Sequence, residues 1–145
     1  MDLGSYKGLA FGYSEGFRVI ASDDYWKATH EEILARTGDC GPGKFGDKFV
    51  PDTLYGESIF IACQIHDWMY WVGRTLEDKR IADFVFFINM VSIVGIDGWF
   101  GIFRLWRCGT YYYAVAKAGE KSFLVGKDGH NLMQTATGSS PEEAQ

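Results

Sequence analysis

Two long apolar stretches lie close together near the middle of the chain. The first, "SIFIACQIHDWMYWVG", covers residues 58–73, and the second, "LEDKRIADFVFFINMVSIVG", covers residues 76–95. Both predict helices that end at a glycine, the first running from about Gly56 or Ser58 to Val72. Because only a short turn separates them, the two helices should be antiparallel. The first is apolar nearly all round, so other elements must cover it on most sides.

The segment before this pair predicts a shorter helix and a small β element. Residues 22–38, "SDDYWKATHEEILARTG", begin with Ser22 or Asp23 as a cap and place acidic residues near the start, which is typical of a helix. The preceding "FRVIAS", at 17–22, indicates a strand or hairpin. We therefore expect a mainly helical, all-α type of fold with an N-terminal β element.

A third helical stretch follows the pair. It covers residues 99–123, with Gly109 as a candidate break. The polar tail at 127–145 has little that could join a core, and we expect it to be flexible. The chain is expected to form a single domain, 1–145, with its core within 38–125.

Composition excludes some classes of partner. The chain has 145 residues, 47% of them hydrophobic, and a net charge of −5. No stripe of Lys and Arg with interleaved aromatics could follow a phosphate backbone, so nucleic acid is not expected as a partner.

The longest uncharged stretch of the second half, 84–96, is too short to span a bilayer. No secretory signal is visible, which leaves the compartment open, with secretion or association with a virion as options.

Ionisable residues interrupt the two apolar stretches. Cys63, His66 and Tyr70 share one face of the first helix, and Asp67 sits beside them. On the second helix, Asp83 is the only acid past the first turn and is flanked by apolar residues. An unpaired buried carboxylate would cost several kcal/mol. We therefore expect Asp83 to meet His66 and Tyr70 across the helix pair.

Asp67 has no obvious basic partner on either long helix. A cation could supply the missing charge. Just upstream, "DCGPGKFG" at 39–46 is glycine-rich, and exposed backbone carbonyl oxygens of such a loop suit a hard cation such as calcium. Loop and carboxylate together predict a calcium site.

These residues resemble the calcium-dependent phospholipase A2 superfamily, in the style of its cysteine-poor bacterial, fungal and viral members. The family pattern is an x-C-G-x-G loop, a helix with C-x-x-H-D-x-x-Y, and a second helix with an inward Asp. Here the three parts are 39–43, 63–70 and Asp83, in that order. The likeness covers roughly residues 38–90.

The resemblance implies an enzyme that hydrolyses the sn-2 ester of glycerophospholipids. His66 would be the general base that takes a proton from the attacking water, and Asp83 would orient it. Tyr70 would donate a hydrogen bond to that carboxylate. The Gly41 amide would help to stabilise the oxyanion of the tetrahedral intermediate. The expected partner is a phospholipid membrane surface or micelle, and no protein partner is implied.

The resemblance also implies calcium as the cofactor. Asp67 would bind it through its side chain, whereas Asp39, Gly41 and Gly43 would contribute backbone carbonyl oxygens. The metal would polarise the ester carbonyl.

The cysteines follow the family only in part. Cys40 and Cys63 stand where the family joins its calcium loop to the catalytic helix by a disulfide, and Cys108 would then be free. Met69 replaces a further cysteine of the secreted enzymes. The stretch from Gly43 to His66 is also longer than in those enzymes.

Two other functions fit the same residues. A catalytically inactive member of the same fold could bind a membrane or a protein. An unrelated helical structural protein, such as a phage or bacterial component, could use the His-Asp pair as a buried hydrogen-bonded cluster.

The excess of aromatic residues also has two interpretations. Most of them are expected in the core, but those of "GWFGIFRLWR", at 98–107, could form a lipid-facing rim because they are paired with two Arg. The aromatic residues for which the core is the main expectation include Trp68, Trp71, Trp99, Phe100, Phe103 and Trp106. The family has a further Tyr on the same carboxylate, and one of residues 111–113 could be that Tyr, although these three are expected mainly in the core and at its rim.

Overall fold

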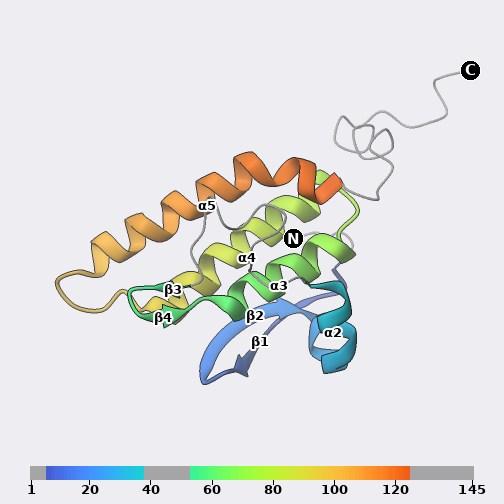
Figure 1. Ribbon diagram of the computed structural model, residues 1–145, viewed down its shortest axis with the longest axis horizontal. Helices are drawn as coiled ribbons and strands as arrows, with labels where there is room; N and C mark the ends of the chain where they lie inside the picture. The colour runs from blue at the N-terminus through green and yellow to red at the C-terminus, as the bar shows by residue number, and fades with distance from the viewer. Residues whose placement is uncertain (1–5, 38–52, 125–145) are drawn as a thin grey trace, which may run out of the picture.

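The computed structural model describes residues 6–37 and 53–124 of the chain. Within these residues it is mainly helical, with 65% helix in five helices and two small two-stranded antiparallel sheets, one of them N-terminal. The three long helices are α3 (Phe60–Val72), α4 (Leu76–Val94) and α5 (Gly101–Leu124). Figure 1 shows α4 between α3 and α5, with the N-terminal elements packed on the other side of the α3/α4 layer.

The N-terminal β element is a hairpin. Strands β1 (Leu9–Ser14) and β2 (Phe17–Ser22) pair in an antiparallel register. The buried side chain of Asn89 on α4 fastens the hairpin to the helices. It accepts a hydrogen bond from Ile20 N at 2.7 Å and donates one to Ile20 O at 2.8 Å. The predicted strand or hairpin is thus confirmed.

The single helix predicted over residues 22–38 is wrong. Two short helices, α1 (Asp23–Lys27) and α2 (His30–Arg36), stand in its place. The break comes at Thr29, which takes an extended conformation and caps α2 in a reciprocal capping box with Glu32. A capping residue has non-helical backbone angles, so a strong cap here ends α1. Gly38, the expected stop, lies outside the described residues.

Helix α3 begins later than predicted. Residues 53–58 form a small hairpin of β3 (Thr53–Leu54) and β4 (Glu57–Ser58), so α3 starts at Phe60 rather than at Gly56 or Ser58. Its end after Val72 agrees with the prediction. Eight of its 13 residues are buried, as expected for a helix that is apolar nearly all round.

Helix α4 matches its prediction closely. Thr75 and Asp78 form a capping box at its start, and Gly95, with φ of 66°, ends it. Residues 73–75 form the short connection from α3, and Figure 1 shows the two helices running antiparallel, as expected. This pairing brings the middle of α3 against the middle of α4.

Helix α5 is continuous. Gly109 does not break it, because the helix runs unbroken from Gly101 to Leu124. A Cβ atom at Gly109 would meet nothing within 4 Å. Gly119 is different, since a Cβ there would lie 2.4 Å from the Tyr70 hydroxyl on α3. The predicted flexible tail at 127–145 lies outside the described residues.

The expectation that most of the six aromatic residues named above lie in the core is wrong. Trp68 is buried, but the other residues of that set are exposed: Trp71, Trp99, Phe100, Phe103 and Trp106. Four of these five lie at the turn between α4 and α5 or on the first two turns of α5. Among the described helices, none combines the length and the apolar character that crossing a bilayer requires.

Candidate active site

His66 and Asp83 meet between α3 and α4. The Nε2 atom of His66 lies 2.8 Å from Oδ1 of Asp83. Both residues are buried, with exposed fractions of 8% and 1%. The antiparallel helix pair therefore brings together two residues that are 17 positions apart in the sequence. This contact confirms the expected meeting of His66 and Asp83.

Tyr70 joins the same carboxylate. One helical turn after His66, its hydroxyl donates to Oδ1 of Asp83 at 2.5 Å. Burial and the neighbouring Asp83 charge raise the pKa of the Tyr70 hydroxyl, so it stays protonated and remains a donor. The rings of His66 and Tyr70 are 4.1 Å apart between centroids, which restricts the orientation of the imidazole.

Lys79 completes the cluster and was not predicted from the sequence. Its Nζ atom lies 2.7 Å from Oδ2 of Asp83 and 3.0 Å from the carbonyl oxygen of Ala116 on α5. The side chain of Lys79 is only 8% exposed. The i, i+4 spacing of Lys79 and Asp83 on one helix was the available signal, because residues at that spacing are neighbours on the helix surface.

The environment keeps Asp83 ionised. Burial alone would raise the pKa of its carboxyl group, but hydrogen bonds and charge from His66, followed by hydrogen bonds from Lys79 and Tyr70, outweigh burial and hold the pKa below its usual value. An ionised carboxylate can only accept hydrogen bonds. The proton in the His66–Asp83 contact is therefore on Nε2, which leaves the lone pair on Nδ1 when the imidazole is neutral.

Helix α5 closes one side of this cluster. Ala116 accepts from Lys79, Gly119 lies against the Tyr70 hydroxyl, and the Phe123 ring packs edge-on to the Tyr70 ring at 5.3 Å. The further Tyr sought among residues 111–113 does not reach Asp83. The hydroxyl of Tyr111 instead accepts from Arg107 at 3.3 Å. Lys79 is the third partner of the carboxylate in place of such a tyrosine.

Asp67 stands beside this cluster without a partner. Within residues 6–37 and 53–124 its half-buried side chain makes no hydrogen bond or ion pair. Burial raises the pKa of its carboxyl group, and the neighbouring His66 only partly offsets this. A half-buried carboxylate with no compensating charge fits a hard cation, which takes oxygen ligands.

The loop expected to complete the cation site is residues 39–46. Asp39, Cys40, Gly41 and Gly43 all lie outside the described residues. Among those that are described, no group of three or more His, Cys, Asp or Glu side chains could hold a metal ion. The expected ligands other than Asp67 are backbone carbonyl oxygens of that loop, so the predicted calcium site stays a prediction.

The cysteines agree with expectation as far as they are described. Cys63 is disulfide-bonded, and Cys108 is a free thiol. Burial raises the pKa of the Cys108 thiol to about 11, so it is not a reactive thiolate at neutral pH. The expected partner of Cys63 is Cys40.

A separate pocket opens between the second half of α3 and the short helices α1 and α2. It has a volume of about 310 Å³, and its lining includes Trp68, Trp71 and Arg36. Neither His66 nor Asp83 lines it. This pocket is therefore not part of the histidine cluster.

The geometry of the cluster is that of an oriented base. One imidazole nitrogen is held by a carboxylate whose other contacts fix its position, and the second nitrogen is left to take a proton. Comparisons of the chain with models of known protein families, with curated proteins and with solved structures found no match.

Proposed function

We propose that this protein is a calcium-dependent phospholipase A2 that hydrolyses the sn-2 ester of glycerophospholipids. The observation that carries the proposal is the Asp83 carboxylate, which binds both His66 Nε2 and the Tyr70 hydroxyl, while Asp67, next to His66, has no partner among the described residues. The spacing His66-Asp67-x-x-Tyr70 and the partner on the next helix are those of the family pattern.

His66 acts as the general base in this proposal. Its Nδ1 atom takes a proton from a water molecule while the water oxygen bonds to the acyl carbon. Asp83 stabilises the imidazolium that forms. The intermediate then breaks the bond to the glycerol oxygen, which receives the proton from His66. The products are a free fatty acid and a lysophospholipid, so no serine or cysteine nucleophile is required.

Calcium fits the one described ligand. Asp67 would hold it through its carboxylate, and the backbone of Asp39, Gly41 and Gly43 is expected to supply the other protein oxygens. When bound, calcium would polarise the ester carbonyl and balance negative charge on the oxyanion. The Gly41 amide is the expected second donor to that oxyanion.

A test is hydrolysis of phospholipid vesicles that carry different acyl chains at sn-1 and sn-2, with product analysis by mass spectrometry. The wild type should release the sn-2 chain only when calcium is present. His66→Gln should lose activity by a factor on the order of 10²–10⁴, the usual contribution of a general base. Asp67→Asn should lose calcium-dependent activity. Circular dichroism would verify that both variants fold.

Arg80→Gln is the matched control. Arg80 lies on α4 next to Lys79, but its side chain is 76% exposed and pairs only with the exposed Glu77 among the described residues. It should retain wild-type activity. Release of the sn-1 chain, activity that survives chelation, or full activity in His66→Gln would each contradict the proposal.

One observation favours a second candidate, a catalytically inactive member that binds a membrane or a protein. Lys79 gives Asp83 a buried counter-charge, and this reduces the negative charge available to stabilise an imidazolium at His66. Calcium binding by isothermal titration without any turnover would support this candidate over the enzyme. Absence of both would favour the structural protein with a buried His-Asp cluster.

A further inference from the structure

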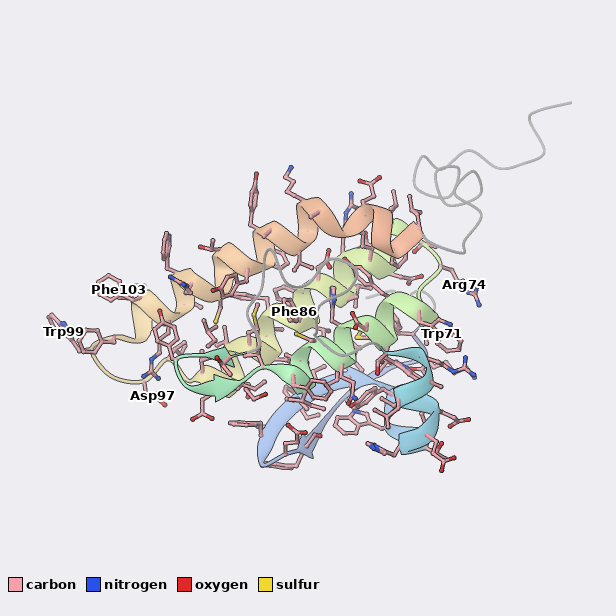
Figure 2. All side chains as sticks on the ribbon, in the orientation of Figure 1. Trp71, Arg74, Phe86, Asp97, Trp99 and Phe103 are labelled. Carbon is pink, nitrogen blue, oxygen red and sulfur yellow. The ribbon has the colours of Figure 1, made fainter. Side chains whose placement is uncertain are left out.

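A cluster of large apolar side chains is exposed where α4 turns into α5. Trp99 is the most exposed of them, at 87%, and Trp106 is exposed at 67%. Figure 2 shows Trp99 and Phe103 projecting outward at one end of the molecule. We call this cluster the aromatic tip; it consists of Ile96, Trp99, Phe100, Ile102, Phe103 and Trp106.

The fold does not need the outward face of α5 to be apolar. The helix already buries Gly101, Cys108 and Tyr111 on the opposite face. Ile102 and Trp106 are one helical turn apart and share the outward face. Single exposed apolar residues are common in soluble proteins, but a contiguous group of six with two Trp is typical of an interaction surface.

The sequence segment that carries the aromatic tip and the rest of α5 up to Gly119 differs in charge from the remainder of the chain. Residues 98–119 contain no Asp or Glu, but they contain Arg104, Arg107 and Lys117. This segment therefore carries +3, which leaves −8 for the rest of a chain whose net charge is −5. Asp97 is the acidic residue that adjoins the tip in sequence. Exposed aromatic side chains on a positively charged segment predict a partner that is negatively charged at its surface and apolar beneath.

We propose that the aromatic tip docks on an anionic phospholipid bilayer. Trp and Phe side chains occupy the boundary between headgroups and acyl chains, where Trp is favoured, and the exposed Arg107 lies near the phosphates. The tip protrudes, as Figure 2 shows, so it can enter a soft surface, whereas a groove would be needed to receive a peptide. Docking goes beyond the proposed hydrolysis and does not depend on it.

A second copy of the chain fits the tip less well. A symmetric pair joined through this surface would bring two copies of Arg104 and Arg107 together, and like charges in a desolvated contact are unfavourable. Anionic headgroups instead supply the opposite charge. No helix among the described residues is long and apolar enough to cross a bilayer, and the docking proposed here is to the membrane surface.

Co-sedimentation with vesicles tests this proposal. The vesicles contain equal parts phosphatidylcholine and phosphatidylglycerol, and EDTA is present so that calcium-dependent hydrolysis cannot contribute. Trp99→Ala/Trp106→Ala should weaken partitioning on the order of a hundredfold, about tenfold for each large aromatic withdrawn from the membrane. Arg107→Gln should weaken it about fivefold at low salt, and less on vesicles of phosphatidylcholine alone.

The matched control removes two exposed aromatics elsewhere. Phe11 and Tyr13 on β1 are exposed at 59% and 76%, so Phe11→Ala/Tyr13→Ala loses a similar apolar surface away from the tip. This control should partition like the wild type. If the double tip variant fails to fold, the single variant Trp99→Ala, at a bend outside α5, should still weaken partitioning about tenfold.

Three results would overturn the proposal. One is a wild type that does not bind the anionic vesicles, and another is a folded tip variant that binds as well as the control. The third is a wild-type dimer, measured by light scattering without lipid, that the tip variant dissociates while vesicle binding stays unchanged. That last result would identify the aromatic tip as a contact between two copies of the chain.

Discussion

The histidine cluster and the aromatic tip depart from the usual distribution of polar and apolar groups in opposite ways. The cluster of His66, Tyr70, Lys79 and Asp83 buries polar groups between three helices, and every buried side-chain nitrogen or oxygen in the described residues has a partner. The aromatic tip exposes groups that the core could have used. Helix α5 serves both regions, since its second half closes the cluster and its first half carries part of the tip.

The largest effect should come from breaking the buried ion pair. Asp83→Ala leaves Lys79 buried without its counter-charge, and this should lower the free energy of unfolding by about 3–5 kcal/mol. Urea denaturation followed by circular dichroism measures it. The double variant Lys79→Met/Asp83→Leu removes both charges and should recover part of that loss, because the buried charge of Lys79 is gone while His66 and Tyr70 still lack the acceptor that Asp83 provided. If the double variant is as unstable as Asp83→Ala, the ion pair is not what makes Asp83 important for stability.

Asp67 should behave in the opposite way to Asp83. Its carboxyl group is half-buried and has no partner within residues 6–37 and 53–124, so Asp67→Asn should stabilise the calcium-free protein by up to about 1 kcal/mol. Because burial raises the folded-state pKa of Asp67, the wild type is penalised where this group is ionised. The advantage of Asp67→Asn should therefore be absent below the unfolded pKa and grow as pH rises through the raised folded pKa.

Thermal unfolding over a series of pH values with EDTA measures this difference. Added calcium should reverse the order of the two melting temperatures, because only the wild type gains from binding. If Asp67→Asn is less stable than the wild type at every pH without calcium, then Asp67 has a structural partner, which would remove the argument for a cation there.

The smallest effect on stability should come from the aromatic tip. Trp99→Ala/Trp106→Ala removes exposed side chains, so the free energy of unfolding should change by no more than about 0.5 kcal/mol. Urea denaturation without lipid measures it, beside Asp83→Ala. A loss as large as that of Asp83→Ala would mean that the aromatic tip is part of the core and is not a free surface.

The arrangement of the long helices could be predicted because their signals are local and repeated. The apolar runs and the closing Gly73 and Gly95 indicated α3 and α4, and the short turn between them set their direction. The same reasoning placed His66 against Asp83. It also indicated that Asp67 would lack a basic partner, and within the described residues it has none.

The rest depended on features that such patterns do not contain. The two-residue strands β3 and β4 are too short to show alternation, so the start of α3 was misplaced. Thr29 and Glu32 have the spacing of a capping box, but the pattern of residues 22–38 as a whole favours one continuous helix. The role of Lys79 depends on Ala116, which α5 brings from 37 residues away. The exposure of Trp99 depends on how α5 leaves α4, and composition alone favoured the core.

One missing methyl group determines how closely α5 approaches the histidine cluster. At Gly119 any side chain would collide with the Tyr70 hydroxyl, since even a Cβ would lie 2.4 Å from it. A bulkier residue at this position would push α5 outward and admit solvent to the Lys79–Asp83 pair. The dryness of the cluster, and with it the strength of the charge interactions inside it, is therefore set by a residue that itself has no chemistry to contribute.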